Sequence, residues 1–225
     1  GLNYYTGLSP KEDGIARFSN YAWGDDYHEL IKKKLYQLLG QLKSIDERLD
    51  GIACVDTSPV TEKAWAQRAG LGWIGKHTNL LTRDYSSWLF LGVLILNQEL
   101  DYDKPYQDDM CGSCTVCIDE YPTDALVDAY QLDANKCISY LTIEHRGDIP
   151  VEFHDKLNNW IYGCDICQEV CPWSQKFSKV TTEHAFQPRL NINRRSFTDW
   201  KKLTEEDFRS LFKKSAVKRT KYSGL

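Results

Sequence analysis

Hydrophobic residues recur at three- and four-residue intervals over residues 26–43, the spacing that lines one face of an α-helix. The apolar positions are Leu30, Ile31, Leu35, Leu38, Leu39 and Leu42. Asp25 and Asp26 precede them and can cap the first turn. The pattern therefore predicts a helix with one buried face, which leaves Lys32 to Lys34 mostly in water.

A strand–helix–strand order follows this helix. The pattern predicts a short buried strand at 51–56, a helix at 64–69, and strands at 78–82 and 88–96. Thr57–Pro59 and the glycine-rich segment 70–75 supply turns between them. This order indicates an α/β core with Asp56 at the carboxyl end of a strand, where ligands usually bind. On the residues alone, Asp56 could equally cap the following helix.

The rest of the chain has weaker periodicity. Short helices around cysteines are expected from 101 to 172, and polar, basic helices near 198–213. The longest apolar run, Trp88 to Leu96, is about half of what a bilayer span needs, so no membrane segment is expected. Because the chain opens at Gly1 and its one methionine is Met110, we expect a piece of a longer protein that lacks parts of both termini.

Charge is distributed unevenly along the 225 residues, whose net charge is -4. Residues 189–225 hold 11 Lys and Arg against 4 Asp and Glu, a net +7, which leaves -11 for the residues before them. A basic end on an acidic body indicates a polyanionic partner.

Seven of the eight cysteines lie between Cys111 and Cys171, six of them at two- or three-residue spacings. Such spacing favours cofactor ligation in a reducing compartment over disulfides. The run Cys111-x2-Cys114-x2-Cys117 lets three thiolates converge on one 4Fe-4S cubane, and the distant Cys171-Pro172 matches the fourth ligand. These four cysteines form one complete predicted site.

A second cluster is predicted at Cys164, Cys167 and Cys137, but its fourth cysteine is missing because Tyr121 stands where one is expected. Three interpretations stay open: an open or non-cysteine fourth ligand, recruitment of Cys54, or loss of the second cluster. Zinc is the alternative metal for Cys-x2-Cys pairs, but the triple run with a distant Cys-Pro favours iron–sulfur.

Smaller motifs have ordinary explanations. Gly70-x4-Gly75-Lys76 imitates a phosphate-binding loop, but His77 replaces the Ser or Thr that would hold magnesium, so a tight turn near another ligand is favoured. His28 and His77 lie beside the predicted site, yet a lone histidine usually belongs to the surface or to a hydrogen bond. No Asp-x-His-x-x-Gly motif offers a lower axial ligand for a corrinoid.

Longer segments of the sequence resemble the epoxyqueuosine reductase family. They are Val55–Val60, Gly70–Asn79, Tyr130–Ala134, Cys137–Glu144 and Cys164–Trp173. The resemblance implies an α/β (α+β) cobalamin-binding core at 1–105, a ferredoxin-like module with two 4Fe-4S clusters at 106–188, and a short helical basic tail at 189–225 that begins a truncated helical-repeat region. Tyr121 departs from the family pattern, which has cysteine there.

The resemblance also implies roles for single residues. Asp56 is expected to donate a proton to the departing epoxide oxygen, with its pKa raised by burial against the corrin. Contacts with base-off cobalamin are expected from Asp56, Asn79, Ser139, Cys164 and Asp165. Electrons are expected to pass from the cluster at Cys137, Cys164 and Cys167 to the one at Cys111, Cys114, Cys117 and Cys171, and then to cobalt.

The expected substrate is a tRNA anticodon stem-loop that carries epoxyqueuosine, with Lys218, Arg219 and Lys221 tracking its phosphates. A flavodoxin or ferredoxin is expected to donate electrons to a cytoplasmic monomer. Two alternatives remain. A relative of the reductive dehalogenases would share corrinoid and clusters, but these enzymes typically carry a twin-arginine signal. A plain electron-transfer module would leave about 100 residues before Cys111 without a purpose.

Overall fold

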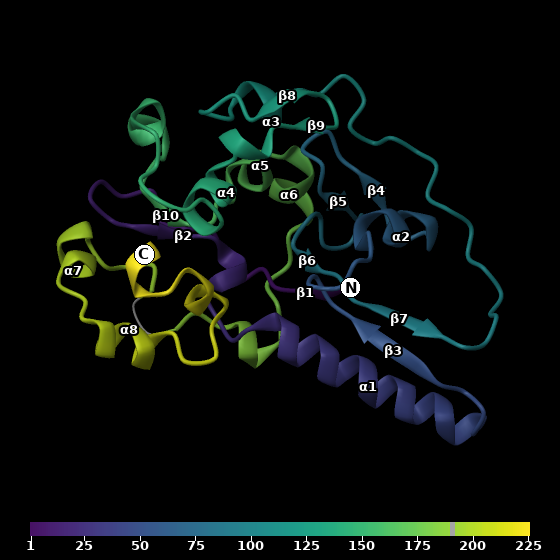
Figure 1. Cartoon of the computed structure of the whole chain (residues 1–225). Helices are drawn as coiled ribbons and strands as arrows, with labels where there is room; N and C mark the ends of the chain where they lie inside the picture. The colour runs from purple at the N-terminus through teal and green to yellow at the C-terminus, as the bar shows by residue number, and fades with distance from the viewer. Residues whose placement is uncertain (190–191) are drawn as a thin grey trace.

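The computed structural model describes residues 1–189 and 192–225, and its longest element is the helix predicted from the first hydrophobic repeat (Figure 1). This helix, α1, spans Tyr27–Ile45 and buries Ile31 and Leu39. Asp26 caps it by accepting a hydrogen bond of 3.1 Å from the backbone N–H of His28. The predicted helix is therefore confirmed, and its three lysines, Lys32 to Lys34, are exposed as expected.

Helix α1 packs along an antiparallel pair of strands, β3 (Gly51–Cys54) and β7 (Val93–Leu96), with Gly51 opposite Leu96. The single strand expected over 88–96 is instead two strands. The first of them, β6 (Leu89–Phe90), does not join the β3–β7 pair but pairs antiparallel with β1 (Leu2–Asn3). The second is β7. Gly92 lies between these two strands. A Cβ at this position would lie 2.7 Å from Ile31 Cγ2, so glycine allows α1 to pack closely here.

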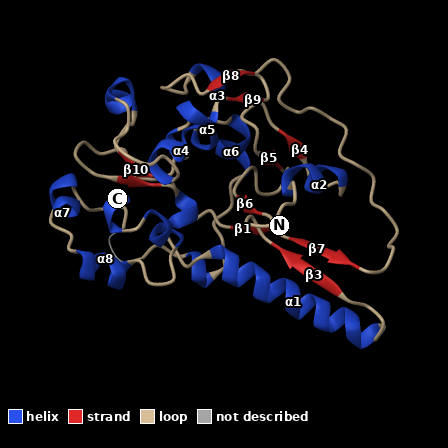
Figure 2. Cartoon of the chain, in the orientation of Figure 1, coloured by secondary structure: helices blue, strands red, loops and turns tan. Residues whose placement is uncertain are grey.

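Helix α2 (Glu62–Arg68) confirms the second predicted helix, and β4 (Trp73–Ile74) pairs antiparallel with β5 (Leu80–Leu81). Among the described residues all sheets are two-stranded, and only one pair is parallel. The strands, red in Figure 2, are short pieces between helices and loops. The fold is therefore mixed α/β, as expected, and its strands form separate two-stranded sheets. The hydrophobic pattern locates strands, but pairing depends on long-range packing that the pattern does not encode.

Short helices surround the cysteines, as predicted. The elements of this region are α3 (Val116–Asp119), β8 (Leu126–Asp128), β9 (Gln131–Leu132), α4 (Ile138–Ile143), β10 (Trp160–Tyr162), α5 (Ile166–Glu169) and α6 (Pro172–Phe177). The 3-10 helices of the chain are Asn20–Ala22, Ala134–Lys136, Val151–Lys156, His184–Phe186, Ala216–Thr220 and Tyr222–Gly224.

The two ends of the chain share one core. Strand β2 (Arg17–Phe18) pairs in parallel with β10, and the basic segment folds against them through α7 (Phe197–Lys201) and α8 (Glu205–Leu211). Figure 1 shows the purple β2 beside the green β10, with the yellow C-terminal segment next to them. The shared core contains Phe18, Trp23, Tyr162, Trp200, Phe208 and Phe212, all buried or nearly so. The helices expected near 198–213 are therefore confirmed.

A buried ion pair connects β2 to α5 in the cysteine-rich region. Arg17 Nη2 lies 2.7 Å from Glu169 Oε1, with side chains only 6% and 3% exposed, and the guanidinium stacks over Trp160 at 3.9 Å. Breaking a buried pair strands a charge, so we expect Arg17→Met to lower the free energy of unfolding by about 3–5 kcal/mol in anaerobic urea denaturation.

The matched control for this prediction is Arg209→Met. Arg209 pairs with Glu205 at 2.7 Å on the surface, so its loss should change stability by less than about 1 kcal/mol. If the two substitutions lowered the free energy of unfolding equally, the buried Arg17–Glu169 ion pair would not have the stabilising role assigned to it.

Within the described residues, the longest helices are too short or too polar to cross a lipid bilayer.

Candidate active site

The structure gathers the first predicted set of cysteines. Cys117 lies in α3 and Cys171 caps α6, while Cys111 and Cys114 lie in the loop before α3. Burial and, after it, the neighbouring thiols of Cys171, Cys111 and Cys114 together raise the pKa of Cys117 to about 11. Four thiols that perturb one another from two distant segments are of the kind and number that could hold a 4Fe-4S cluster.

Lys76 ties the glycine-rich turn to this cysteine loop. Its Nζ donates hydrogen bonds to the carbonyl oxygens of Gly112 at 2.6 Å and Cys114 at 3.0 Å. Trp173, beside Cys171, donates from Nε1 to the carbonyl oxygen of Met110 at 3.1 Å. The lysine that imitates a phosphate-binding loop therefore has a structural partner in the cysteine module.

The second set is also gathered. Cys137 caps α4, and Cys164 and Cys167 flank the start of α5. Burial raises the pKa of Cys167 well above its usual value, and Cys164 and Cys137 add to this. The Tyr121 hydroxyl lies 3.5 Å from Cys137 Sγ and 3.8 Å from Cys164 Sγ. Cys54 lies on β3, outside both sets.

A site for a single metal ion would need its ligands closer together than a cubane does. In residues 1–189 and 192–225, no three His, Cys, Asp or Glu side chains meet as closely as the ligands of one metal ion do. A cubane has iron at several corners, so its cysteine ligands lie farther apart than those of a single ion.

A cavity of about 340 Å³ adjoins the second set and draws its walls from distant segments. It brings together three of the predicted cofactor contacts, Asn79, Ser139 and Cys164. The other lining residues include Tyr21, Tyr27, Lys63, His77, Phe90, Leu132, Cys137 and Cys167. The first set of cysteines does not line this cavity, and the expected order of electron transfer stays a prediction.

The other two predicted contacts, Asp56 and Asp165, do not line this cavity. Asp165 is held elsewhere. Its carboxylate is 1% exposed and accepts hydrogen bonds from Ser19 Oγ at 2.5 Å and from the Asn20 backbone N–H at 2.7 Å. Burial raises the pKa of Asp165 to about 7. In this structure the residue fastens the β2 region to α5 instead of lining the cavity.

The glycine-rich turn positions Asn79. A Cβ on Gly72 would lie 1.9 Å from the Leu81 carbonyl oxygen, so only glycine fits there. Asn79 donates its backbone N–H to His77 Nδ1 at 3.2 Å, and Lys63 Nζ donates to the Thr78 carbonyl oxygen at 2.8 Å. Burial lowers the pKa of His77 to about 4, so its ring is neutral at pH 7.

Asp56 follows β3 and adopts φ 50°, a left-handed conformation that is uncommon outside glycine and recurs at functional sites. His28 lies between two carboxylates. Its Nε2 is 3.1 Å from Asp56 Oδ2, and its Nδ1 is 2.7 Å from Asp26 Oδ1. The His28 ring also stacks on Tyr27, with centroids 4.0 Å apart.

The protonation of this pair follows from its hydrogen bonds. A hydrogen bond with His28 lowers the pKa of Asp56, whose side chain is 57% exposed. The rise expected from burial against the corrin stays a prediction. Hydrogen bonds to Asp26 and then Asp56 raise the pKa of His28 to about 9. Sequence reasoning left His28 as an ordinary histidine, although Asp26-x-His28 at a helix start was a usable signal.

The His28 pairing predicts a pH dependence of stability. Because the folded pKa is about 9 and the unfolded value about 6.5, the contribution is complete below pH 6.5 and is lost as pH rises through 9. We expect His28→Gln to destabilise the protein at pH 6 and to differ less from the parent at pH 9.5, by urea denaturation.

His154→Gln is the control, since His154 Nε2 contacts the Ile149 carbonyl oxygen instead of carboxylates. A His28→Gln penalty that stays constant across this pH range would argue against a protonated His28.

Two of the three predicted tRNA residues lie near Asp56 and Asp26. Arg219 Nε is 2.8 Å from Glu144 Oε1, and after the His28 hydrogen bond Arg219 adds to the lowering of the Asp56 pKa. Burial raises the pKa of Asp26, but the hydrogen bonds with His28 outweigh it and the net pKa is lowered. Lys218 contributes to this lowering. Lys221 is exposed at the next turn.

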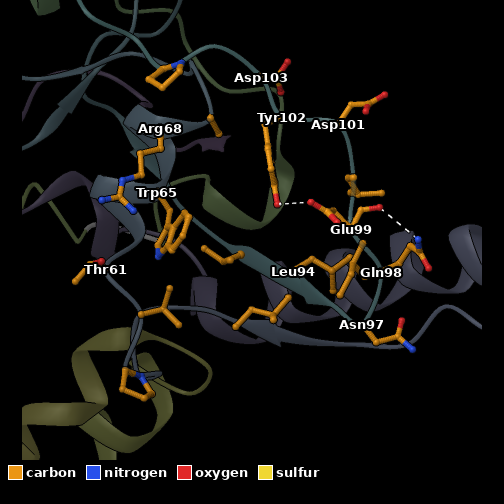
Figure 3. A pocket seen from close by; sticks show the side chains of 18 residues that line it. Thr61, Trp65, Arg68, Leu94, Asn97, Gln98, Glu99, Asp101, Tyr102 and Asp103 are labelled. Carbon is orange, nitrogen blue, oxygen red and sulfur yellow. Dashed lines mark hydrogen bonds between the residues drawn. The ribbon is translucent and has the colours of Figure 1, made fainter.

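A larger cavity, of about 1170 Å³, lies elsewhere, between α2, β7 and residues 97–105. In Figure 3 Trp65 and Arg68 face Leu94 across it, and Tyr102 reaches Glu99 at 3.2 Å. Its walls contain none of the predicted site residues. The smaller cavity beside the cysteines is therefore the candidate active site.

Known families match both halves of this arrangement. A family model described as 4Fe-4S double cluster binding domain matches residues 110–174. Another, described as epoxyqueuosine reductase QueG, DUF1730, matches residues 1–57.

Whole proteins and solved structures agree. Epoxyqueuosine reductase of Cellulophaga algicola is 48% identical over 227 residues, which cover 100% of this chain and 72% of that protein. Selenomethionine-labelled epoxyqueuosine reductase superposes with a TM-score of 0.90 at 33% identity, covering 99% of this chain and 60% of that one. An epoxyqueuosine reductase with a tRNA-Tyr epoxyqueuosine-modified stem loop gives 0.86 at 33% identity, over 96% and 57%.

The chain thus spans less than two thirds of the length of these solved structures. Its identity to the whole proteins extends over its full length. The expected family is confirmed, and the chain belongs to the epoxyqueuosine reductase family of oxidoreductases.

Proposed function

We propose that this chain reduces epoxyqueuosine to queuosine in a tRNA anticodon loop, with cobalamin bound against the 340 Å³ cavity and electrons from a 4Fe-4S cluster. The observation that carries the proposal is the convergence of Asn79, Ser139 and the second set of cysteines on one cavity. The Asp56–His28 pair adjoins its wall through Tyr27, on which His28 stacks. Proteins with these family features are named for this reaction.

The cavity walls fit a corrinoid in kind. Tyr21, Tyr27, Phe90 and Leu132 offer apolar faces to a planar ring, and Asn79, Ser139 and Lys63 offer polar atoms to its amide side chains. His77 Nε2 is buried and has no hydrogen-bond partner among the described residues. Because Nδ1 accepts from Asn79, Nε2 carries the hydrogen and can donate to a ligand instead of binding cobalt.

Removal of the epoxide oxygen requires two electrons and two protons, breaks two carbon–oxygen bonds, forms a carbon–carbon double bond and releases water. When bound, cobalamin supplies the low-valent cobalt for this cleavage, and the cluster at Cys111, Cys114, Cys117 and Cys171 supplies electrons. The protein's own part is to bind the base and to deliver protons to the leaving oxygen.

The Asp56–His28 pair is suited to this delivery. His28 holds a proton at neutral pH between Asp26 and Asp56. Asp56 lies at the exposed end of this hydrogen-bonded chain, so it can take a proton from His28 and pass it to the leaving oxygen of the substrate. This assigns His28 as the proton reservoir and Asp56 as the donor.

Substrate binding is assigned to the basic tail. Lys218 and Arg219 lie close enough to Asp26 and Asp56 to affect their titration, so phosphates bound there would bring an anticodon loop next to the proton donor. We assign Lys221 to the same surface. A flavodoxin or ferredoxin is the proposed electron donor, and the protein is proposed to act as a cytoplasmic monomer.

The test is turnover of a synthetic stem-loop carrying epoxyqueuosine by anaerobically reconstituted protein with cobalamin and a chemical reductant. Mass spectrometry should show a product lighter by one oxygen atom. Reduction of an organohalide but not of the stem-loop would favour the dehalogenase alternative. Loss of all cobalamin on gel filtration would favour the electron-transfer module.

A further inference from the structure

We propose that this chain carries a single 4Fe-4S cluster, at Cys111, Cys114, Cys117 and Cys171, and that the side chain of Tyr121 fills the site of the second. The inference concerns metal content and does not rest on the proposed reaction.

The Tyr121 hydroxyl lies inside the second set of cysteines. Its oxygen is 3.5 Å from Cys137 Sγ and 3.8 Å from Cys164 Sγ, and it also accepts a hydrogen bond of 3.2 Å from the Ile138 backbone N–H. Any cubane bound by Cys137, Cys164 and Cys167 would have to occupy the space between their sulfur atoms. The phenol lies against two of these three sulfur atoms, so a cubane bound by all three would have to displace it.

A tyrosine also reaches much farther from the backbone than the cysteine that the family has at this position. A cysteine would hold its sulfur at the edge of the site, with the cluster beyond it. Tyr121 extends a six-membered ring and a hydroxyl along the same path, so it removes a ligand and fills volume in one substitution.

Tyr121 is packed against the core on one side. It is 4% exposed and packs with Ala125, Ile138 and Trp160, which are 0–1% exposed. It also lines the 340 Å³ cavity, as do the three cysteines of the second set. Protein cores are close-packed, so the ring cannot retreat into the core to make room for a cubane without displacing these neighbours.

The sulfur atoms of the second set have protein partners in this arrangement. Tyr121 contacts Cys137 and Cys164, and the Ile166 backbone N–H donates to Cys164 Sγ at 3.4 Å. Asn79 Nδ2 lies 3.9 Å from Cys167 Sγ. Even with the ring displaced, three thiolates would leave one iron of a cubane without a protein ligand.

The experiment counts metal in the whole chain, reconstituted anaerobically with iron and sulfide. The parent should hold about four iron and four sulfide per chain, and Tyr121→Cys about eight of each, because it restores both the ligand and the space. Tyr121→Phe is the matched control and should stay at about four, since the ring remains. Circular dichroism of the three proteins checks that each is folded.

Electron paramagnetic resonance of the reduced proteins gives a second readout. The parent and Tyr121→Phe should show one isolated cluster signal, and Tyr121→Cys a signal broadened by magnetic coupling between two clusters. About eight iron in the parent would overturn the proposal, as would about one zinc per chain beside four iron. A folded Tyr121→Cys that stays at four iron would also overturn it. None of these readouts requires cobalamin or tRNA.

Discussion

Asp56→Asn is expected to lower the rate of epoxide reduction by about 100- to 10,000-fold, the range lost with a general acid, while cobalamin still binds. Asparagine has nearly the same shape and can still accept a hydrogen bond from His28 Nε2, which lies 3.1 Å from the carboxylate. It cannot pass a proton to the leaving oxygen. The measurement is single-turnover conversion of the epoxyqueuosine stem-loop, with cobalamin occupancy read from the visible spectrum.

Asp50→Asn is the matched control for this variant. Asp50 precedes β3, just as Asp56 follows it, and its carboxylate pairs with Lys43 at 2.8 Å on the surface. The control should turn over at the parental rate. Parental activity in Asp56→Asn would remove Asp56 from the proton path.

Cys171→Ala is expected to reduce the iron content of the reconstituted protein from about four per chain to near zero. Cys171 comes from a segment distant from Cys111, Cys114 and Cys117, so its loss leaves one corner of the cubane without a protein thiolate. Cys171 is also buried against Trp73 and Leu81, so the change opens a cavity as well. Iron and sulfide analysis after gel filtration measures the effect.

Cys54→Ala separates cluster loss from the general cost of removing a buried thiol. Cys54 is buried on β3, outside both sets of cysteines, so this variant should lose some stability and keep its iron. Full iron content in Cys171→Ala would show that the first set is assigned wrongly.

The parts of the fold that the sequence predicted are those encoded locally. The leucine repeat and Asp26 define α1 because a helix forms from contacts within its own residues. The cysteine sets were predictable because iron ligation demands particular spacings. Strand pairing was not predictable, since β3 finds its partner β7 about 40 residues later through packing under α1.

In the site, too, some features could be predicted from the sequence and others depend on long-range contacts. Asn79 and Ser139 meet at the cavity as the family resemblance implied, whereas Asp165 turns away to bond Ser19 and Asn20. His28 and Asp56 are 28 positions apart in the sequence, so no local sequence pattern could predict that they pair. The substitution at Tyr121 was visible in the sequence, but only the structure shows where the phenol goes.

The central claim is that the cavity beside the cysteine module binds a corrin ring. Its most direct test is titration of the anaerobically reconstituted protein with cobalamin, followed by gel filtration and a visible spectrum. The account predicts about one cobalamin retained per chain in the base-off form, with retention weakened in Ser139→Leu, which places a larger apolar side chain in the cavity wall. A protein that keeps its iron–sulfur colour but retains no cobalamin would contradict it.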